Sequence, residues 1–234
     1  MTQSNPLVRR TTIVRVYPPD RVPIFSLFSR DGVTAMTSKF NLTPINASEG
    51  AEANFGAGRA EIGGRPIIIE LLKINERRVI LTAQGDTREA RAVLSEVLEQ
   101  LKALDARNPS PFLPEGHLID REESVLVQQL SFDWTALLSD ALSRFIATKL
   151  LPAASEDLGE ARIAGVQVNF DIRYQAKDGK LAEAGIEISP KKFAVETRAG
   201  SGLGDNLYYT ISPTDAARHQ SLLEDLERSL KKAK

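Results

Sequence analysis

The chain has 234 residues, of which 42% are hydrophobic and 26% are charged, with a formal net charge of −1. These values are ordinary for a folded protein, and a nearly neutral chain gives no general reason to expect nucleic acid or acidic lipid as a partner. There are no cysteines, which excludes disulfides, thiolate metal sites and cysteine nucleophiles. No apolar run approaches the roughly 20 residues of a membrane span, and the first residues lack the pattern of a secretory signal. We therefore expect a cytoplasmic protein that makes no membrane contact.

The first part of the chain is predicted to be mostly extended. Its strands are expected at residues 11–17, 22–28, 33–42, 67–72 and 79–81. Pro18 and Pro19 end the first of these, because proline cannot donate to a sheet ladder. Residues 30–32 are predicted as a turn, and the Gly- and Ala-rich residues 47–65 as a loop with at most one short strand.

A long helix follows, and its start is visible in the sequence. Asp86 is a typical N-cap residue, and Glu89 three positions later completes a capping-box pattern. The apolar residues after it recur with the helical period and form one stripe: Ala90, Val93, Leu94, Val97, Leu101 and Leu104.

Residues 108–120 contain three prolines and predict a linker, which would divide the chain into an N-terminal half (residues 1–107) and a C-terminal half (residues 121–234). The C-terminal half is predicted to hold five strands, at residues 125–130, 163–174, 182–188, 193–197 and 207–211. A helix after Asp133 is expected to end at Pro152 and to turn its apolar side chains to the core: Trp134, Leu137, Leu138, Ala141, Leu142 and Phe145. The last helix is expected to begin at Ser212 and to bury a second stripe, formed by His219, Leu222, Leu223, Leu226 and Leu230.

The predicted fold class is α+β, with antiparallel sheets that are each backed by amphipathic helices. In the C-terminal half the order is strand, helix, four strands, helix. That order is similar to the TATA-binding-protein-like and helix-grip arrangements, and the resemblance implies helices packed on one face of a curved sheet. The apolar stripes of the two long helices also correspond at an offset of 129 residues (219 minus 90). Internal duplication would explain this, but any two amphipathic helices that follow strands look alike, so both interpretations stay open.

The polar face of the predicted C-terminal sheet is the first candidate site. If helices cover the apolar face, the side chains of the other face are free for recognition: Asn169, Asp171, Arg173, Glu183, Glu187, Glu196, Arg198 and Tyr208. This face is either an ordinary solvated surface or a polar binding surface. Its net charge is −2, from four acids and two arginines, which disfavours a DNA-contacting sheet.

A second candidate is a basic group near the N-terminus, which would suit an anionic partner: Arg9, Arg10, Arg15 and Arg21. A solvated tail is the alternative. The two histidines, His117 in the linker and His219 on the last helix, lie 102 positions apart (219 minus 117) and predict no metal site. No nucleophile, cofactor or metal signature is present, so we expect no cofactor.

These observations favour a non-catalytic interaction or assembly protein, which binds another protein or its own copy through an open sheet face or edge. A small-molecule or enzymatic pocket between helix and sheet is one alternative. A nucleic-acid binder that uses the N-terminal arginines is the other.

Overall fold

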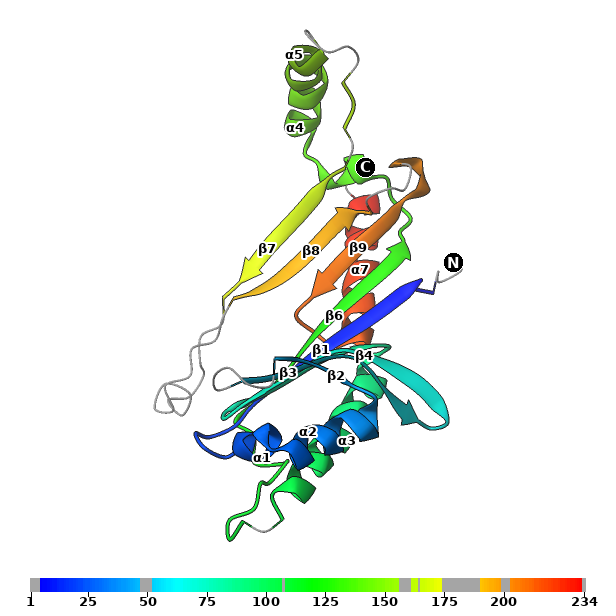
Figure 1. Ribbon diagram of the computed structural model, residues 1–234. Coiled ribbons are helices and arrows are strands. Elements are labelled where there is room, and N and C mark those ends of the chain that lie inside the picture. The colour runs from blue at the N-terminus through cyan, green and yellow to red at the C-terminus, as the bar shows by residue number, and fades with distance from the viewer. Residues whose placement is uncertain are drawn as a thin grey trace.

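The strands that the structure describes form a single nine-stranded antiparallel sheet with helices packed against it, as the computed structural model shows (Figure 1). The structure describes residues 5–46, 52–106, 108–155, 161–163, 165–173, 190–198 and 203–232. The strand order is β2-β3-β4-β5-β1-β6-β9-β8-β7. The α+β class with an antiparallel sheet is therefore confirmed, but the two halves share one sheet and do not build separate ones.

The centre of the sheet is the pair formed by β1 (Val8–Val16) and β6 (Ile119–Gln129). The strands on one side belong to the first half of the chain: β2 (Thr43–Asn46), β3 (Glu52–Ile62), β4 (Arg65–Asn75) and β5 (Arg78–Gln84). Those on the other side belong to the second half: β7 (Gln167–Ile172), β8 (Lys191–Thr197) and β9 (Leu207–Ser212). The predicted strand at residues 182–188 lies outside the described residues. The predicted division into two domains stays a prediction.

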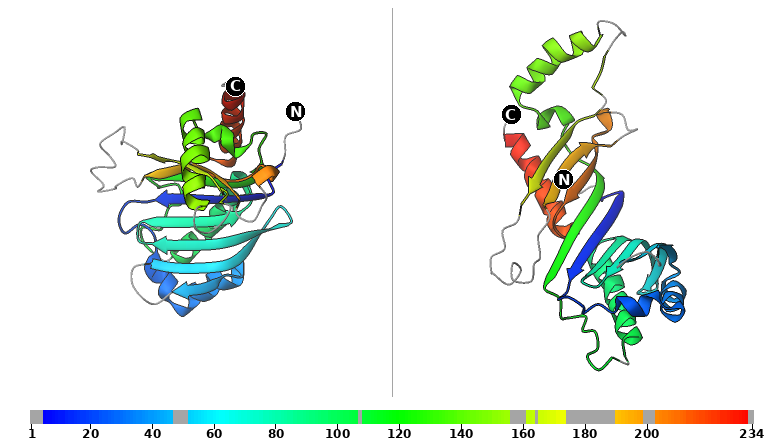
Figure 2. Two further views of the ribbon diagram at one scale, coloured as in Figure 1. Left: turned by 90° about the horizontal axis from the view of Figure 1, so that it is seen from above. Right: turned by 60° about the vertical axis from the view of Figure 1, so that its left-hand side comes forward.

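The helices that pack on the sheet lie on one of its faces (Figure 2). They are α1 (Ile24–Phe28), α2 (Arg30–Phe40) and α3 (Thr87–Leu104) over the first half, and α7 (Ala216–Lys232) over the second. A large core fills the space beneath the first three helices, whereas a smaller core lies beneath α7. None of the described helices is both long enough and apolar enough to cross a bilayer.

Both long helices begin with an aspartate cap. In α3 the Asp86 side chain accepts from the Glu89 amide and Glu89 bonds back to the cap, so the predicted capping box is confirmed. In α7 the Asp215 side chain accepts from the Arg218 amide at 2.9 Å. The predicted start at Ser212 is therefore too early, because that residue still belongs to β9.

The predicted strands at residues 22–28 and 33–42 are wrong, since both segments are helical. The Ser29 hydroxyl caps α2 by accepting from the Gly32 amide at 3.0 Å, where a turn was expected. Met36 and Phe40 then lie one turn apart and are buried in the first core. Gly32 permits the close approach of α1 to α2, because a Cβ there would lie 1.9 Å from the Ser26 carbonyl oxygen.

The predicted loop at residues 47–65 is also wrong, because β3 is one of the longest strands, with 11 residues. It pairs with β4 along almost its full length. Its glycines are needed for packing: a Cβ on Gly58 would lie 2.4 Å from the Leu42 side chain. Ala57, which has a φ of 50°, interrupts the ladder of hydrogen bonds between β3 and β4.

The predicted helix after Asp133 lies on the core only at its start, where Trp134 and Leu137 pack against the second core, and the turns that follow form a projecting arm. The segment consists of a 3₁₀ turn (Trp134–Leu137), α4 (Asp140–Phe145), a π-helical turn (Ile146–Leu150) and α5 (Leu151–Ser155). From α4 onward it stands clear of the sheet (Figures 1 and 2). Leu142 and Phe145 are 45% and 52% exposed, so their predicted core position is wrong. Pro152 lies within α5 and does not end the helix.

The hydrogen bonds beside the central strand pair repeat from one half to the other. Thr11 and Ser124 lie opposite each other in the β1–β6 register, and both are fully buried. The Thr11 hydroxyl donates to the Gly85 carbonyl at 3.2 Å, and the Ser124 hydroxyl donates to the Thr214 carbonyl at 2.8 Å. Gly85 and Thr214 are 129 positions apart (214 minus 85), the same offset that relates the starts of α3 and α7 (216 minus 87).

Candidate functional site

The face of the sheet opposite the helices is the largest candidate surface. In β6, Ser124 bonds to His219 of α7 and Leu126 packs against Leu223 of α7, so both face the helix. Alternation along the strand then turns Val125 and Val127 to the other face. Figure 1 looks onto this open face in the second half of the chain, where α7 lies behind β6 and β9.

Strand β9 turns its apolar residues toward the open face. In β9 the side chains beneath α7 are buried, and each of them carries a hydroxyl group: Tyr208, Thr210 and Ser212. The residues between them face outward and are partly exposed: Leu207, Tyr209 and Ile211. An amphipathic strand ordinarily shows the opposite arrangement, with apolar residues facing the covered side. In β9, therefore, the open side of the strand is more apolar than the side that the helix covers.

The middle of the open face continues the same surface across β1 and β5. Val14 and Ile80 lie opposite each other in the register and are both partly exposed. Arg10 spans the halves, because its guanidinium donates to the Tyr209 hydroxyl at 3.2 Å and lies 3.6 Å from the Glu70 carboxylate. The surface is thus an apolar band with a tyrosine and a paired arginine at its centre.

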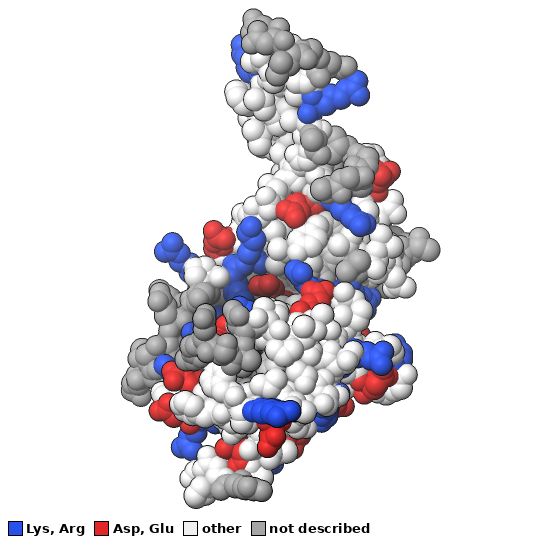
Figure 3. All heavy atoms as spheres, viewed as in Figure 1, with Lys and Arg blue, Asp and Glu red and all other residues white. Residues whose placement is uncertain are grey.

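The charges of the open face balance. Strand alternation places six basic side chains there (Arg10, Arg59, Lys73, Arg78, Arg121 and Lys192) and six acidic ones (Glu52, Glu61, Glu70, Glu123, Asp171 and Glu196). Acidic and basic groups are interspersed in the space-filling view, without a large area of one sign (Figure 3).

The structure describes six of the eight residues of the predicted polar face. Asn169 and Asp171 are exposed on β7, and Glu196 of β8 lies on the same side of the sheet. Arg173 and Arg198 directly follow these strands and are exposed, while Glu183 and Glu187 lie outside the described residues. The outward position predicted for Tyr208 is wrong. This side chain is 1% exposed, packs on Phe132 and donates to the Phe132 carbonyl at 3.0 Å, and burial raises its pKa to about 12.

The predicted basic group is dispersed. Arg10 belongs to the open face, whereas alternation in β1 turns Arg9 and Arg15 to the helix side. Arg15 lies 3.3 Å from Asp120, and Arg21 is exposed in the loop after β1. These side chains therefore do not form one cationic patch.

No family model and no curated protein matches this chain. What the sheet can bind must therefore come from its own chemistry.

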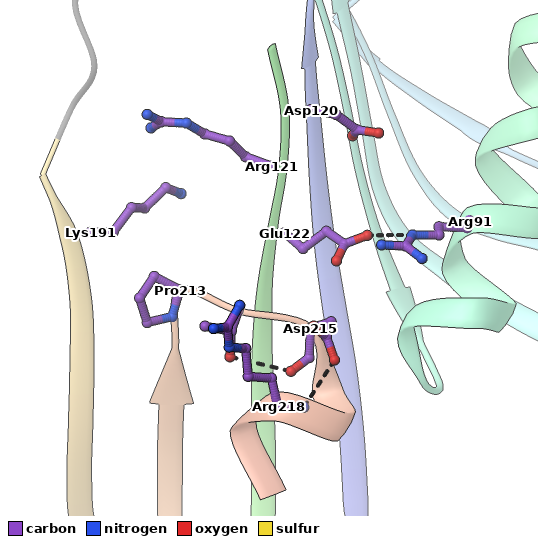
Figure 4. A pocket seen from close by; sticks show the side chains of 9 residues that line it. Arg91, Asp120, Arg121, Glu122, Lys191, Pro213, Asp215 and Arg218 are labelled. Atoms are coloured by element: carbon purple, nitrogen blue, oxygen red, sulfur yellow. Dashed lines mark hydrogen bonds and ion pairs between the residues drawn. The ribbon is translucent and has the colours of Figure 1, made fainter. Parts of the chain in front are cut away.

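A charged hollow of about 330 Å³ lies where the two halves meet, beside the start of α7 (Figure 4). Its lining contains four basic side chains (Arg91, Arg121, Lys191 and Arg218) and three acidic ones (Asp120, Glu122 and Asp215). Arg91 of α3 bonds to Glu122 of β6, and this bond raises the pKa of the guanidinium. The Arg91–Glu122 pair connects α3 to β6, and the mixture of basic and acidic side chains means that the hollow does not present a single charge to a ligand.

His219 lies in a polar cluster beneath α7. Its Nδ1 is 2.9 Å from the Ser124 hydroxyl oxygen, and its Nε2 is buried without a hydrogen-bond partner among the described residues. Burial lowers the pKa of His219 to about 4, so the imidazole is neutral near pH 7. The ring is fully buried, so a substrate cannot reach it. In the part of the chain that the structure describes, no group of three acidic or histidine side chains has the arrangement of a metal site.

Proposed function

We propose that this chain is a non-catalytic protein-interaction protein, which binds a protein partner on the open face of its sheet. The observation that carries the proposal is the apolar open side of β9, where Leu207, Tyr209 and Ile211 are partly exposed, in a sheet whose packed helices α1, α2, α3 and α7 lie on the other face. Adjoining apolar side chains that stay partly exposed on an uncovered sheet face are typical of an interaction site. A tyrosine and an arginine at its centre agree with the composition of interface cores, where both residue types are enriched.

The symmetry of the strand order supports a finer statement about the fold. On either side of the β1–β6 pair, the strands follow the same order, with β5, β4 and β3 corresponding to β9, β8 and β7. Together with the repeated hydrogen bonds, this supports an internally duplicated arrangement similar to that of the TATA-binding protein, with one sheet face free for a ligand. The similarity concerns topology and carries no function by itself.

The charge balance favours protein over nucleic acid as the ligand. Nucleic-acid binding depends on clustered cations that neutralise phosphates, whereas the open face has equal numbers of acids and bases. Several of its cations are paired, including Arg10 with Glu70 and Lys73 with Glu52. The filled core beneath α3 likewise favours this proposal over a small-molecule pocket between helix and sheet.

A matched pair of lysine variants tests the proposal. Ile80→Lys introduces a charge into the middle of the open face, and Ser95→Lys introduces the same charge on the exposed side of α3. The tagged chain is purified from the cells that make it. The wild type and the Ser95→Lys variant should retain a protein partner in fixed stoichiometry, and Ile80→Lys should lose it. Equal recovery by all three chains contradicts the proposal, as does recovery of nucleic acid that high salt removes.

A further inference from the structure

The flank of α7 is exposed at positions that are buried in α3. With the offset of 129 residues, Val93 corresponds to Leu222 and Val97 to Leu226. Val93 and Val97 are fully buried, whereas Leu222 is 38% exposed and Leu226 is partly exposed. Both helices begin with the same aspartate cap and are amphipathic, so the difference comes from what packs beside them.

In the first half the flank of α3 is covered by α2, and α1 packs beside α2. Met36 and Phe40 of α2 belong to the same core as Val93 and Val97, and α2 contacts α3 directly. These two helices form the connection between β1 and the outer strands of the first half. The cover of α3 is therefore the segment that follows the central strand.

In the second half the corresponding segment is the projecting arm, which follows β6. No residue of α4, the π-helical turn or α5 is buried. Its apolar side chains face solvent, with Leu142, Phe145 and Leu150 between 44% and 52% exposed. The 3₁₀ turn packs against the second core, but from α4 onward the arm has an apolar surface without a counterpart, and Leu222 on the flank of α7 stays 38% exposed.

The uncovered flank continues onto the edge strand. Phe170 and Ile172 of β7 are 57% and 36% exposed. Phe170 lies 6.3 Å from Phe193, which packs against the second core, so both residues are on the side of the sheet that carries α7.

We propose that two copies of this chain form a dimer by exchanging their arms. The α4–α5 segment of each copy lies beside α7 and over β7 of the other, in the place that α1 and α2 occupy beside α3. Such an exchange reuses contacts that a single chain could make and is a common route to symmetric dimers. The surface involved is on the helix side of the sheet, so the inference does not depend on the open-face proposal.

The geometry of the hinge favours a second copy over a return to the same chain. Leu138 and Ser139 are both extended, with ψ values of 144° and 155°, and separate the 3₁₀ turn from α4. They direct the arm away from the body (Figure 2). Leu142 and Phe145 are thereby carried away from their own α7 and presented to another molecule.

The absence of cysteine makes a disulfide test unambiguous. Leu142→Cys and Leu222→Cys are placed in separate chains, mixed, exchanged under mild denaturation and oxidised. The exchanged dimer predicts a disulfide-linked heterodimer as the dominant product. In the control, Lys231→Cys replaces Leu222→Cys. Lys231 lies on the opposite side of α7 from Leu222, so the control should give little disulfide-linked heterodimer. A chain that carries both cysteines is oxidised in parallel. The inference is overturned if that chain forms its disulfide internally and the mixture of single variants gives no heterodimer.

Sedimentation equilibrium supplies an independent measurement. The wild type should have twice the chain mass of 25.7 kDa. Phe145→Glu and Leu222→Glu should each reduce the mass to that of one chain while keeping the circular dichroism spectrum, because both side chains are already exposed in the single chain. A monomeric wild type, or a mass that these substitutions leave unchanged, overturns the inference.

Discussion

Acidification should destabilise the protein through His219. This imidazole has a pKa of about 4 in the folded chain because it is buried, against about 6.5 in the unfolded chain. Between these values the unfolded chain binds the proton more tightly, so the free energy of unfolding decreases as the pH falls from about 6.5 to about 4. At about 1.4 kcal/mol per pKa unit, the total loss is about 3 kcal/mol, most of it present at about pH 4.5.

A double difference isolates this contribution from that of the acidic residues. Urea unfolding is measured at about pH 7.5 and about pH 4.5 for the wild type and for His219→Leu, whose side chain does not titrate. The wild type should lose about 2–3 kcal/mol more than the variant on acidification. His117→Gln, in the loop before β6, is the matched control and should behave as the wild type does. If His219→Leu loses as much stability as the wild type, the buried neutral histidine is refuted.

Three further substitutions test the packing. In the Phe145→Glu background, which is expected to be monomeric, Val93→Ala should cost about 2 kcal/mol in urea unfolding, because a fully buried side chain is lost. Leu222→Ala should cost well under half of that in the same background, and equal costs would contradict the asymmetry of the two flanks. Gly32→Ala should cost at least about 2 kcal/mol, because its Cβ meets the α1 backbone at 1.9 Å, and a neutral effect would show that α1 and α2 are not so close. Tyr208→Phe should cost about 1 kcal/mol through its lost hydrogen bond, and an unchanged melting temperature would place the phenol in solvent.

Local signals in the sequence predicted the elements whose cause is local. The capping box at Asp86 and Glu89 and the stripe after it specify α3 without help from the rest of the chain. The segments that became α1, α2 and β3 contain no such signal. Residues such as Met36 are helical because that conformation buries them against the sheet, and β3 is a strand because β4 pairs with it.

The candidate surface could be predicted as a sheet face, but its polarity could not. In β9, alternation is visible in the sequence, yet it does not show which set of residues faces the helix. The apolar set, which includes Tyr209 and Ile211, faces outward because Tyr208 and Thr210 fill the space beneath α7 and form hydrogen bonds there. Shifting an assignment by one residue exchanges the two faces of a strand, and only the packed partner decides between them.

Site-specific photocrosslinking tests the open-face proposal most directly. A benzophenone amino acid is introduced at Ile80 or Tyr209 on the open face, and at Ser95 on the exposed side of α3 as the control. On irradiation of the cells that make the protein, both open-face positions should give the same discrete protein adduct, and Val14→Lys, between them on β1, should remove it. No adduct at either open-face position, or an equal one at Ser95, would contradict the proposal that this face is the binding surface.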